Sequence, residues 1–139
     1  MKTKLVLILA FSIFINCYSQ SSMEYIDKGL SKMGTDFGTG IQDYQGAIAD
    51  FSKAIEINPK NEYAYFFRGL SKALLFDYRG AIADYSEAIE INPNSAGAYH
   101  NRGLSKISLG QKESGCLDLS KAEELGYAKA YERIKEYCN

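Results

Sequence analysis

A long internal repeat constrains the fold of this chain more than any other feature. Residues 46–59 read GAIADFSKAIEINP and residues 80–93 read GAIADYSEAIEINP, which agree at 12 of 14 positions. Residues 62–75 match residues 96–109 at the same offset, at 8 of 14 positions. The copies begin 34 residues apart. A fixed period of 34 residues is typical of a solenoid, in which each unit buries its apolar face against the next unit.

Each half of the repeat has the spacing of an amphipathic helix. In residues 81–89, apolar side chains recur at i, i+1, i+4, i+7 and i+8, which places them on one face of a helix. Asp43 and Asp77 precede one helix of each pair, and Asn61 and Ser95 precede the other. We predict that all four side chains cap the helices that follow them.

Prolines and glycines mark further positions of the repeat. Pro59 and Pro93 are predicted to end the second helix of each pair, because the residue before a proline is driven away from helical geometry. Gly69 and Gly103 fall inside helices at one register, where glycine is unfavourable. We therefore expect the helices to approach there more closely than a Cβ atom would allow.

Opposite charges also recur at fixed positions. Arg68 and Arg102 share one register, and Asp50, Asp84 and Asp118 share another. We expect ion pairs between helices that tie neighbouring repeats together. Recognition of a ligand by the arginines is the alternative interpretation.

Together these features resemble the tetratricopeptide repeat family. The second repeat supplies the aromatic, small and proline residues of the family pattern as Tyr65, Gly69, Ala81, Tyr85, Ala88 and Pro93. The first repeat follows the pattern with an insertion near residues 33–42, and the third departs from it at Tyr127, where the pattern has proline. The resemblance covers roughly residues 22–138.

The resemblance implies an all-α fold, a right-handed α-solenoid with seven helices and no sheet. Its three helix-turn-helix units would be residues 22–59, 62–93 and 96–127. Residues 128–139 would form a C-terminal capping helix, since the last unit of a stack must cover its exposed end.

Composition and residue counts exclude several classes of function. Sixteen basic against 17 acidic side chains give a formal charge of −1, which argues against binding nucleic acid through phosphate contacts. His100 is the only histidine and has no carboxylate at helical spacing, so we predict that the protein is not an enzyme. One histidine and three cysteines predict no metal site, and we expect no cofactor and no small-molecule substrate.

The resemblance also implies a binding surface, because the first helix of each repeat lines the concave face in this family. The residues of this chain at the contact positions are Ile26, Leu30, Tyr63, Phe66, Phe67, Leu70, His100, Asn101 and Leu104. Chaperone-binding members hold a C-terminal carboxylate with basic residues at such positions, and those basic residues are missing here. The apolar groove instead predicts a protein or peptide segment with large apolar side chains.

The predicted function is therefore that of a non-catalytic protein–protein interaction scaffold. A solenoid that associates with itself in the cell envelope is the alternative. A further alternative is that the insertion or the N-terminal segment of the chain itself partly covers Phe66 and Phe67.

The first residues have the composition of a secretory signal. Lys2 and Lys4 precede a charge-free run, residues 5–15, that is too short to span a bilayer. We predict a signal peptide over residues 1–19, and so an exported protein, periplasmic or secreted. It would be attached to a membrane only if Cys17 carried a lipid, which is the less favoured alternative because the residues before it depart from the lipoprotein pattern.

Two cysteines, Cys116 and Cys138, would remain after cleavage of the signal. Antiparallel packing of the last two helices brings the start of one beside the end of the next, so the geometry permits a disulfide between them. A pair of buried free thiols is the alternative.

Overall fold

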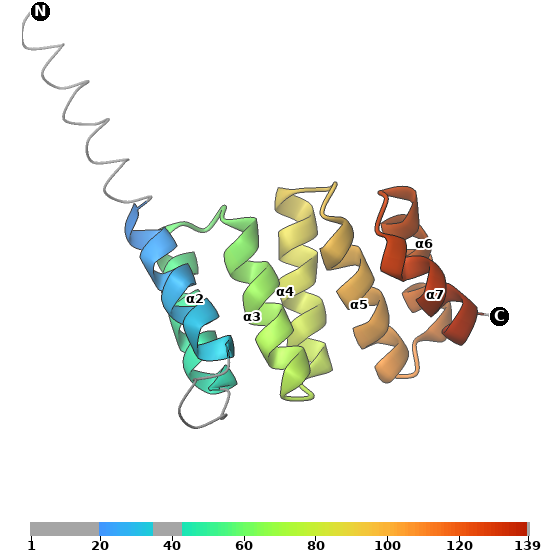
Figure 1. The fold of residues 1–139 in the computed structure, drawn as a ribbon, viewed down its shortest axis with the longest axis horizontal. Helices are drawn as coiled ribbons and strands as arrows, with labels where there is room; N and C mark the ends of the chain where they lie inside the picture. The colour runs from blue at the N-terminus through green and yellow to red at the C-terminus, as the bar shows by residue number, and fades with distance from the viewer. Residues whose placement is uncertain (1–19, 35–42, 139) are drawn as a thin grey trace, which may run out of the picture.

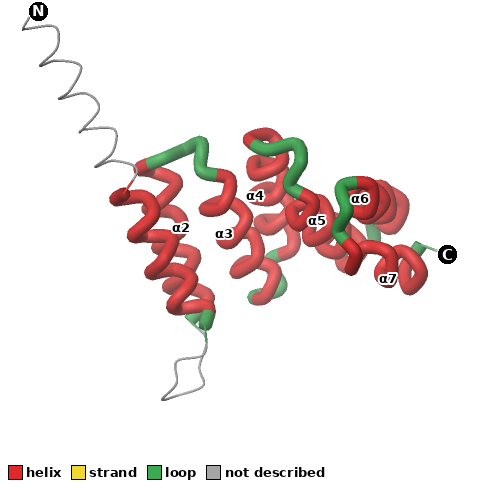
Figure 2. Tube along the Cα trace, turned by 45° about the horizontal axis from the view of Figure 1, so that its top comes forward, coloured by secondary structure: helices red, strands yellow, loops and turns green. Residues whose placement is uncertain are grey.

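The computed structural model describes residues 20–34 and 43–138, and all regular secondary structure in these ranges is helical. Residues 20–33 are helical and are followed by six further helices: α2 (Tyr44–Ile57), α3 (Glu62–Leu74), α4 (Tyr78–Ile91), α5 (Ala96–Ser108), α6 (Lys112–Glu124) and α7 (Ala128–Tyr137). Three antiparallel hairpins stand side by side, with α7 after the last of them (Figures 1 and 2). This confirms the predicted all-α solenoid of three helix-turn-helix units with a capping helix.

Two predicted segments fall outside this description. The predicted signal peptide, residues 1–19, and most of the predicted insertion, residues 35–42, lie outside the described residues. Among the helices that are described, none is both long enough and apolar enough to cross a membrane.

The predicted N-caps form at three of the four positions. Asp43 and Asp77 each accept a hydrogen bond from the backbone N–H three residues later, and Asn61 accepts from two N–H groups in the first turn of α3. Ser95 precedes α5 as predicted, but its side chain accepts no capping hydrogen bond. The prediction for Ser95 is therefore wrong; Ser95 instead lines a pocket between α3 and α5.

One large side chain per hairpin fills the core. Phe51, Tyr85 and Leu119 occupy the same position of successive repeats, and each is fully buried. Alanines around them are also fully buried and leave room for these larger groups: Ala47, Ala54, Ala81, Ala88 and Ala122. The repeat thus buries one apolar face between successive helices, as its period predicts.

The glycines inside the helices face these large side chains. A Cβ atom on Gly69 would lie 3.0 Å from the ring of Tyr85. A Cβ atom on Gly103 would lie 2.8 Å from the carbonyl oxygen of Gly115, so α5 and α6 meet backbone to backbone. The predicted close approach at Gly69 and Gly103 is confirmed.

The predicted ion pairs also form, but within each hairpin rather than between hairpins. Arg68 of α3 donates two hydrogen bonds to Asp84 of α4, at 2.7 and 3.0 Å, and Arg102 of α5 does the same to Asp118 of α6, at 2.8 Å each. The link to the preceding repeat is a hydrogen bond from the same guanidinium, as from Arg68 to Ser52 at 3.1 Å. The sequence register did not distinguish the two arrangements, because an aspartate recurs on both sides of each arginine.

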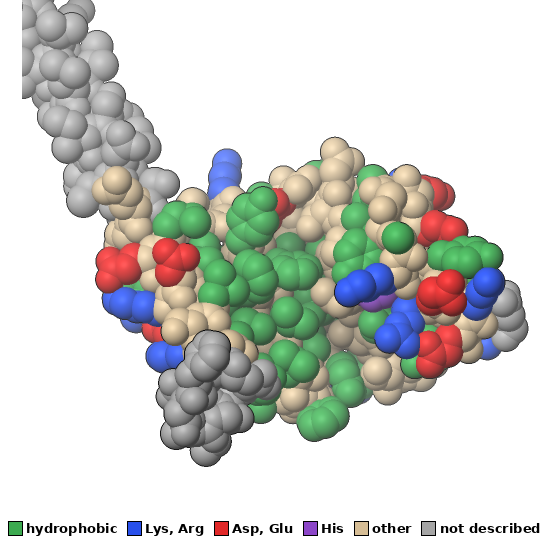
Figure 3. All heavy atoms as spheres, in the orientation of Figure 1, with side chains coloured by type: hydrophobic (Ala, Val, Ile, Leu, Met, Phe, Trp, Pro, Cys, Tyr) green, Lys and Arg blue, Asp and Glu red, His purple; other side chains and the backbone are tan. Residues whose placement is uncertain are grey.

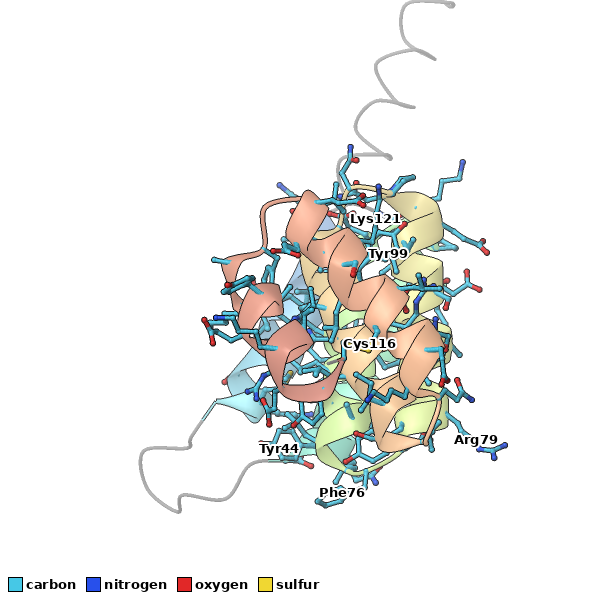
Figure 4. The ribbon with its side chains drawn as sticks, turned by 90° about the vertical axis from the view of Figure 1, so that its right-hand side faces the viewer. Tyr44, Phe76, Arg79, Tyr99, Cys116 and Lys121 are labelled. Atoms are coloured by element: carbon cyan, nitrogen blue, oxygen red, sulfur yellow. A yellow bond between two sulfur atoms is a disulfide. The ribbon has the colours of Figure 1, made fainter. Side chains whose placement is uncertain are left out.

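The turn between α3 and α4 contains a residue with an unfavourable backbone conformation. Phe76 has φ 63°, whereas the equivalent turn after α5 has Gly110 with φ 78°. The Phe76 side chain is 77% exposed and projects away from the helices on the side where the α3–α4 turn lies (Figure 4). A left-handed conformation costs a non-glycine residue roughly 1–2 kcal/mol, so this turn is less favourable than its glycine-containing counterpart.

A disulfide joins the beginning of α6 to the end of α7. The bond connects Cys116, which Figure 4 labels, to Cys138, and their Cα atoms lie 5.8 Å apart. Helix α7 fully buries only one of its own side chains, that of Ala130. The disulfide is therefore a main attachment of this terminal helix.

Candidate partner-binding face

The first helices of the three hairpins form one surface of the solenoid. We call the surface formed by residues 20–33, α3 and α5 the first-helix face. Hydrophobic side chains gather over the middle of this face (Figure 3). Seven of the nine predicted groove residues are at least partly exposed: Leu30, Tyr63, Phe66, Phe67, Leu70, Asn101 and Leu104.

The other two predicted groove residues are buried, which corrects the expectation that they contact a partner. Ile26 is only 3% exposed and belongs to the core cluster around Phe51. His100 is 5% exposed, and its ring lies 4.7 Å from the ring of Tyr127, which immediately precedes α7. Packing of the neighbouring helices covers both side chains.

Phe66 and Phe67 combine exposed area with a fixed position. Their rings meet edge to face, with centroids 5.2 Å apart. Phe67 also stacks on buried Phe51 at 5.9 Å, and Phe66 lies 5.9 Å from buried Tyr85. Because core contacts hold the two rings, little side-chain freedom would be lost when a partner binds them.

A pocket of about 160 Å³ opens between the N-terminal ends of α3 and α5. Its lining consists of Glu62, Tyr63, Phe66, Phe67, Ser95 and Gly97. Tyr63, Phe66 and Phe67 are among the predicted groove residues, whereas Glu62, Ser95 and Gly97 are not. A signal was present at Gly97, which takes the position in the third repeat that Tyr63 has in the second. Where the second repeat has a large side chain, the third has none, and this helps to leave the space open.

A second and larger hollow, of about 460 Å³, lies between α5 and α7. Leu104, Ile107 and Ser108 line it from α5, and Arg133 and Tyr137 line it from α7. The guanidinium of Arg133 lies 2.6 Å from the carboxylate of Glu136, so its charge is already paired. Leu104 is one of the predicted groove residues. Arg133 and Tyr137 could not be predicted from the repeat, because the capping helix has no counterpart in the preceding repeats.

His100 lies in an electropositive environment between α5 and α7. Its Nδ1 atom is buried and has no hydrogen-bond partner among the described residues. Burial lowers the pKa of His100 below its ordinary value, and the positive charges of Arg133 and Lys129 lower this pKa further. The folded protein therefore keeps His100 neutral at a pH where an exposed histidine is charged.

The shifted pKa of His100 predicts that acid destabilises the protein. The unfolded chain binds a proton at His100 below about pH 6.5, whereas the folded chain resists it. The free energy of unfolding should therefore be highest above this pH. It should fall as the pH drops towards the pKa of His100 in the folded protein, by at most about 1.4 kcal/mol per pH unit. Urea unfolding of wild type and His100→Phe between pH 7.5 and 5 measures this, and parallel pH curves for the two would contradict it.

The described residues contain no group of three or more His, Cys, Asp or Glu side chains that could hold a metal ion.

Comparison with protein families identifies the repeats. A TPR repeat model matches residues 77–110, and a tetratricopeptide repeat model matches residues 39–61. A comparison with curated proteins finds no match.

Solved structures share the fold at low sequence identity. The first TPR of Spaghetti (RPAP3) bound to an HSP90 peptide is 23% identical, covering 86% of this chain and 92% of that chain, with a TM-score of 0.78. The Arabidopsis OM64 TPR domain is 22% identical, covering 86% and 98%, with a TM-score of 0.73. The TPR2B domain of yeast Sti1, in a complex with pHsp70, is 21% identical, covering 84% and 98%, with a TM-score of 0.64. Two segments of this chain, residues 39–61 and 77–110, thus match tetratricopeptide repeat models, and the chain shares the fold of solved TPR domains.

Proposed function

We propose that this protein is a non-catalytic interaction scaffold that binds a segment of a partner protein on its first-helix face. The exposed apolar surface of α3 and α5 carries this proposal, above all the pair Phe66 and Phe67, which core contacts hold in place. Large aromatic side chains that are partly exposed yet rigid are typical of the residues that dominate binding energy at protein interfaces. A partner segment that covers these rings would remove their apolar surface from water, and this burial would favour association.

The structural neighbours support the same class of function. The first TPR of Spaghetti (RPAP3) was solved with an HSP90 peptide, and the TPR2B domain of Sti1 was solved in a complex with pHsp70. Since none of the residues lining the pocket between α3 and α5 is basic, we do not propose that this pocket holds a C-terminal carboxylate. The partner we propose is a segment that places large apolar side chains on Phe66 and Phe67. We further propose that the chain is exported after removal of residues 1–19, as the sequence of that segment indicates.

Two pairs of exposed leucines allow a matched test of the binding face. Leu30→Asp with Leu74→Asp places two charges on the first helices of the first and second hairpins, where these leucines are 36% and 44% exposed. Leu109→Asp with Leu117→Asp places the same charges elsewhere, at leucines that are 36% and 73% exposed. We expect the first pair to abolish co-purification of the wild-type partner from the native cells, because buried charge opposes association, and the second pair to leave it intact.

The outcomes of this experiment are distinct. Equal loss of the partner with both variants, equal retention with both, or no protein captured by the wild type would each refute binding at the first-helix face. Light scattering of the purified wild type tests the alternative of self-association, since a mass that rises with concentration would make a second copy of the chain the partner. Circular dichroism of all variants checks that the helices are intact.

A further inference from the structure

The pocket between the N-terminal ends of α3 and α5 has a chemical character that the rest of the first-helix face lacks. Its walls are aromatic, from Phe66, Phe67 and Tyr63, and the acidic residue Glu62 also lines it. No lining residue carries a positive charge. The pocket therefore combines an apolar interior with a single negative charge.

The carboxylate of Glu62 lacks a partner within the described part of the chain. Its Oε2 atom is buried and accepts no hydrogen bond there. An unsatisfied carboxylate oxygen away from water is costly, and a cationic donor would satisfy it. Because the terminal torsion of a glutamate side chain is soft, a small rotation would turn this oxygen towards a group that enters the pocket.

The shape and size of the pocket restrict what can enter it. Its volume of about 160 Å³ suits one side chain rather than a helix. Gly97 forms part of the wall, and a Cβ atom at that position would lie 3.4 Å from the ring of Phe66, in ordinary contact. A longer side chain at residue 97 would therefore occupy the space that a ligand needs.

We propose that this pocket binds a basic side chain, lysine or arginine, of the partner segment. The methylene stem of such a residue would lie against Phe66 and Phe67, and its charged end would meet the carboxylate of Glu62. The ring of Tyr63, which is 58% exposed at the same pocket, would add a cation–π contact. This inference rests on the proposed function, because it names the chemistry of one residue in the segment that the first-helix face would bind.

Small molecules that copy single side chains test this pocket without knowledge of the partner. n-Butylammonium has the stem and charge of a lysine side chain, n-butanol has the stem without the charge, and butyrate carries the opposite charge. Each would be titrated into the ¹⁵N-labelled mature protein, with the amide resonance of Gly97 as the local readout. We expect n-butylammonium to bind on the order of millimolar and about fivefold more tightly than n-butanol, with butyrate weakest.

Three variants separate the charge of the pocket from its shape. Glu62→Gln should remove the preference for n-butylammonium over n-butanol while leaving n-butanol binding unchanged. Gly97→Leu, followed at the amide resonances of Phe66 and Phe67, should abolish binding of both, because the new side chain fills the pocket. Glu113→Gln, a matched control in the first turn of α6, should change neither.

The results that would overturn the inference are equally specific. It fails if n-butanol or butyrate binds as tightly as n-butylammonium, if the preference survives Glu62→Gln, or if the Gly97 resonance does not shift. These outcomes are independent of the leucine variants above, none of which lines the pocket. If n-butylammonium binds selectively but the leucine variants refute binding at the first-helix face, the pocket chemistry stands and only the scaffold proposal is rejected. If the leucine variants support the first-helix face but n-butylammonium does not bind selectively, only the pocket proposal is rejected.

Discussion

Asp84→Asn should lower the free energy of unfolding by about 3 kcal/mol, because it leaves two partly buried cations without their counter-charge. Asp84 is 3% exposed, and its carboxylate binds both Arg68 and Lys72, each with an N···O distance of 2.7 Å. Arg68 and Lys72 have only 20% and 21% of their side-chain surface exposed, so water replaces little of the lost interaction. The asparagine keeps the shape of the site but cannot neutralise either charge.

The same substitution should also loosen the contact between hairpins. Arg68 bridges Asp84 of its own hairpin to Ser52 of the preceding one. Without the carboxylate, the guanidinium loses the two hydrogen bonds that fix its orientation towards Ser52. Urea unfolding of the mature chain, followed by circular dichroism, measures the total effect as a lower midpoint.

The first hairpin offers a matched control for this prediction. Asp50 occupies the position in the first repeat that Asp84 has in the second, but its ion pair is with Lys32, whose side chain is 41% exposed. The Asp50 side chain is itself 15% exposed, but its loss leaves only one cation, and that cation is accessible to water. Asp50→Asn should therefore cost only about 1 kcal/mol. Equal losses for the two variants would show that the arginine network of the second hairpin contributes nothing beyond an ordinary surface pair.

Removal of the disulfide should destabilise the C-terminal end by about 3 kcal/mol on the chain-entropy model, since the bond closes a loop across a sequence separation of 22 residues. In the variant Cys116→Ser with Cys138→Ser, we expect this loss to be concentrated in α7. That helix fully buries only Ala130, so few apolar contacts remain to hold it once the covalent link is gone. Amide hydrogen exchange should show α7 losing protection before α3 and α4 do.

A reducing agent provides the control for the disulfide. A dithiol reductant should lower the unfolding midpoint of the wild type to that of the double-serine variant, and it should leave the variant itself unchanged. If the amides of α7 exchange as slowly in the double-serine variant as in the wild type, the prediction is contradicted, because packing alone would then hold the terminal helix.

The repeat made the fold of this chain predictable in detail. The period located three hairpins and a terminal helix, and the N-cap side chains Asp43, Asp77 and Asn61 marked where helices begin. Glycines at one register indicated where helices meet, as they do at Gly69 and Gly103. These features depend on spacing along the chain and on local hydrogen bonds, which a sequence records directly.

The candidate site was predictable only in part. Tyr63, Phe66 and Phe67 were identified from their register, and they do lie on the first-helix face. Glu62 and Ser95 were missed, because a charged or hydroxyl residue at a helix start is ordinarily explained by the helix itself. Their proximity to the aromatic residues arises only when α3 and α5 are packed side by side.

The sequence alone thus determined the helices, their order and the side chains that face the interior of each hairpin, because helical periodicity and a regular repeat fix which face of each helix is apolar. Tertiary structure decided how deeply each side chain is covered and which partner it meets. It buried Ile26 and His100, it directed Arg68 to the aspartate of its own hairpin, and it placed Glu62 at an aromatic pocket. Those outcomes depend on distances between helices that are remote in sequence, and residue spacing along one chain does not specify such distances.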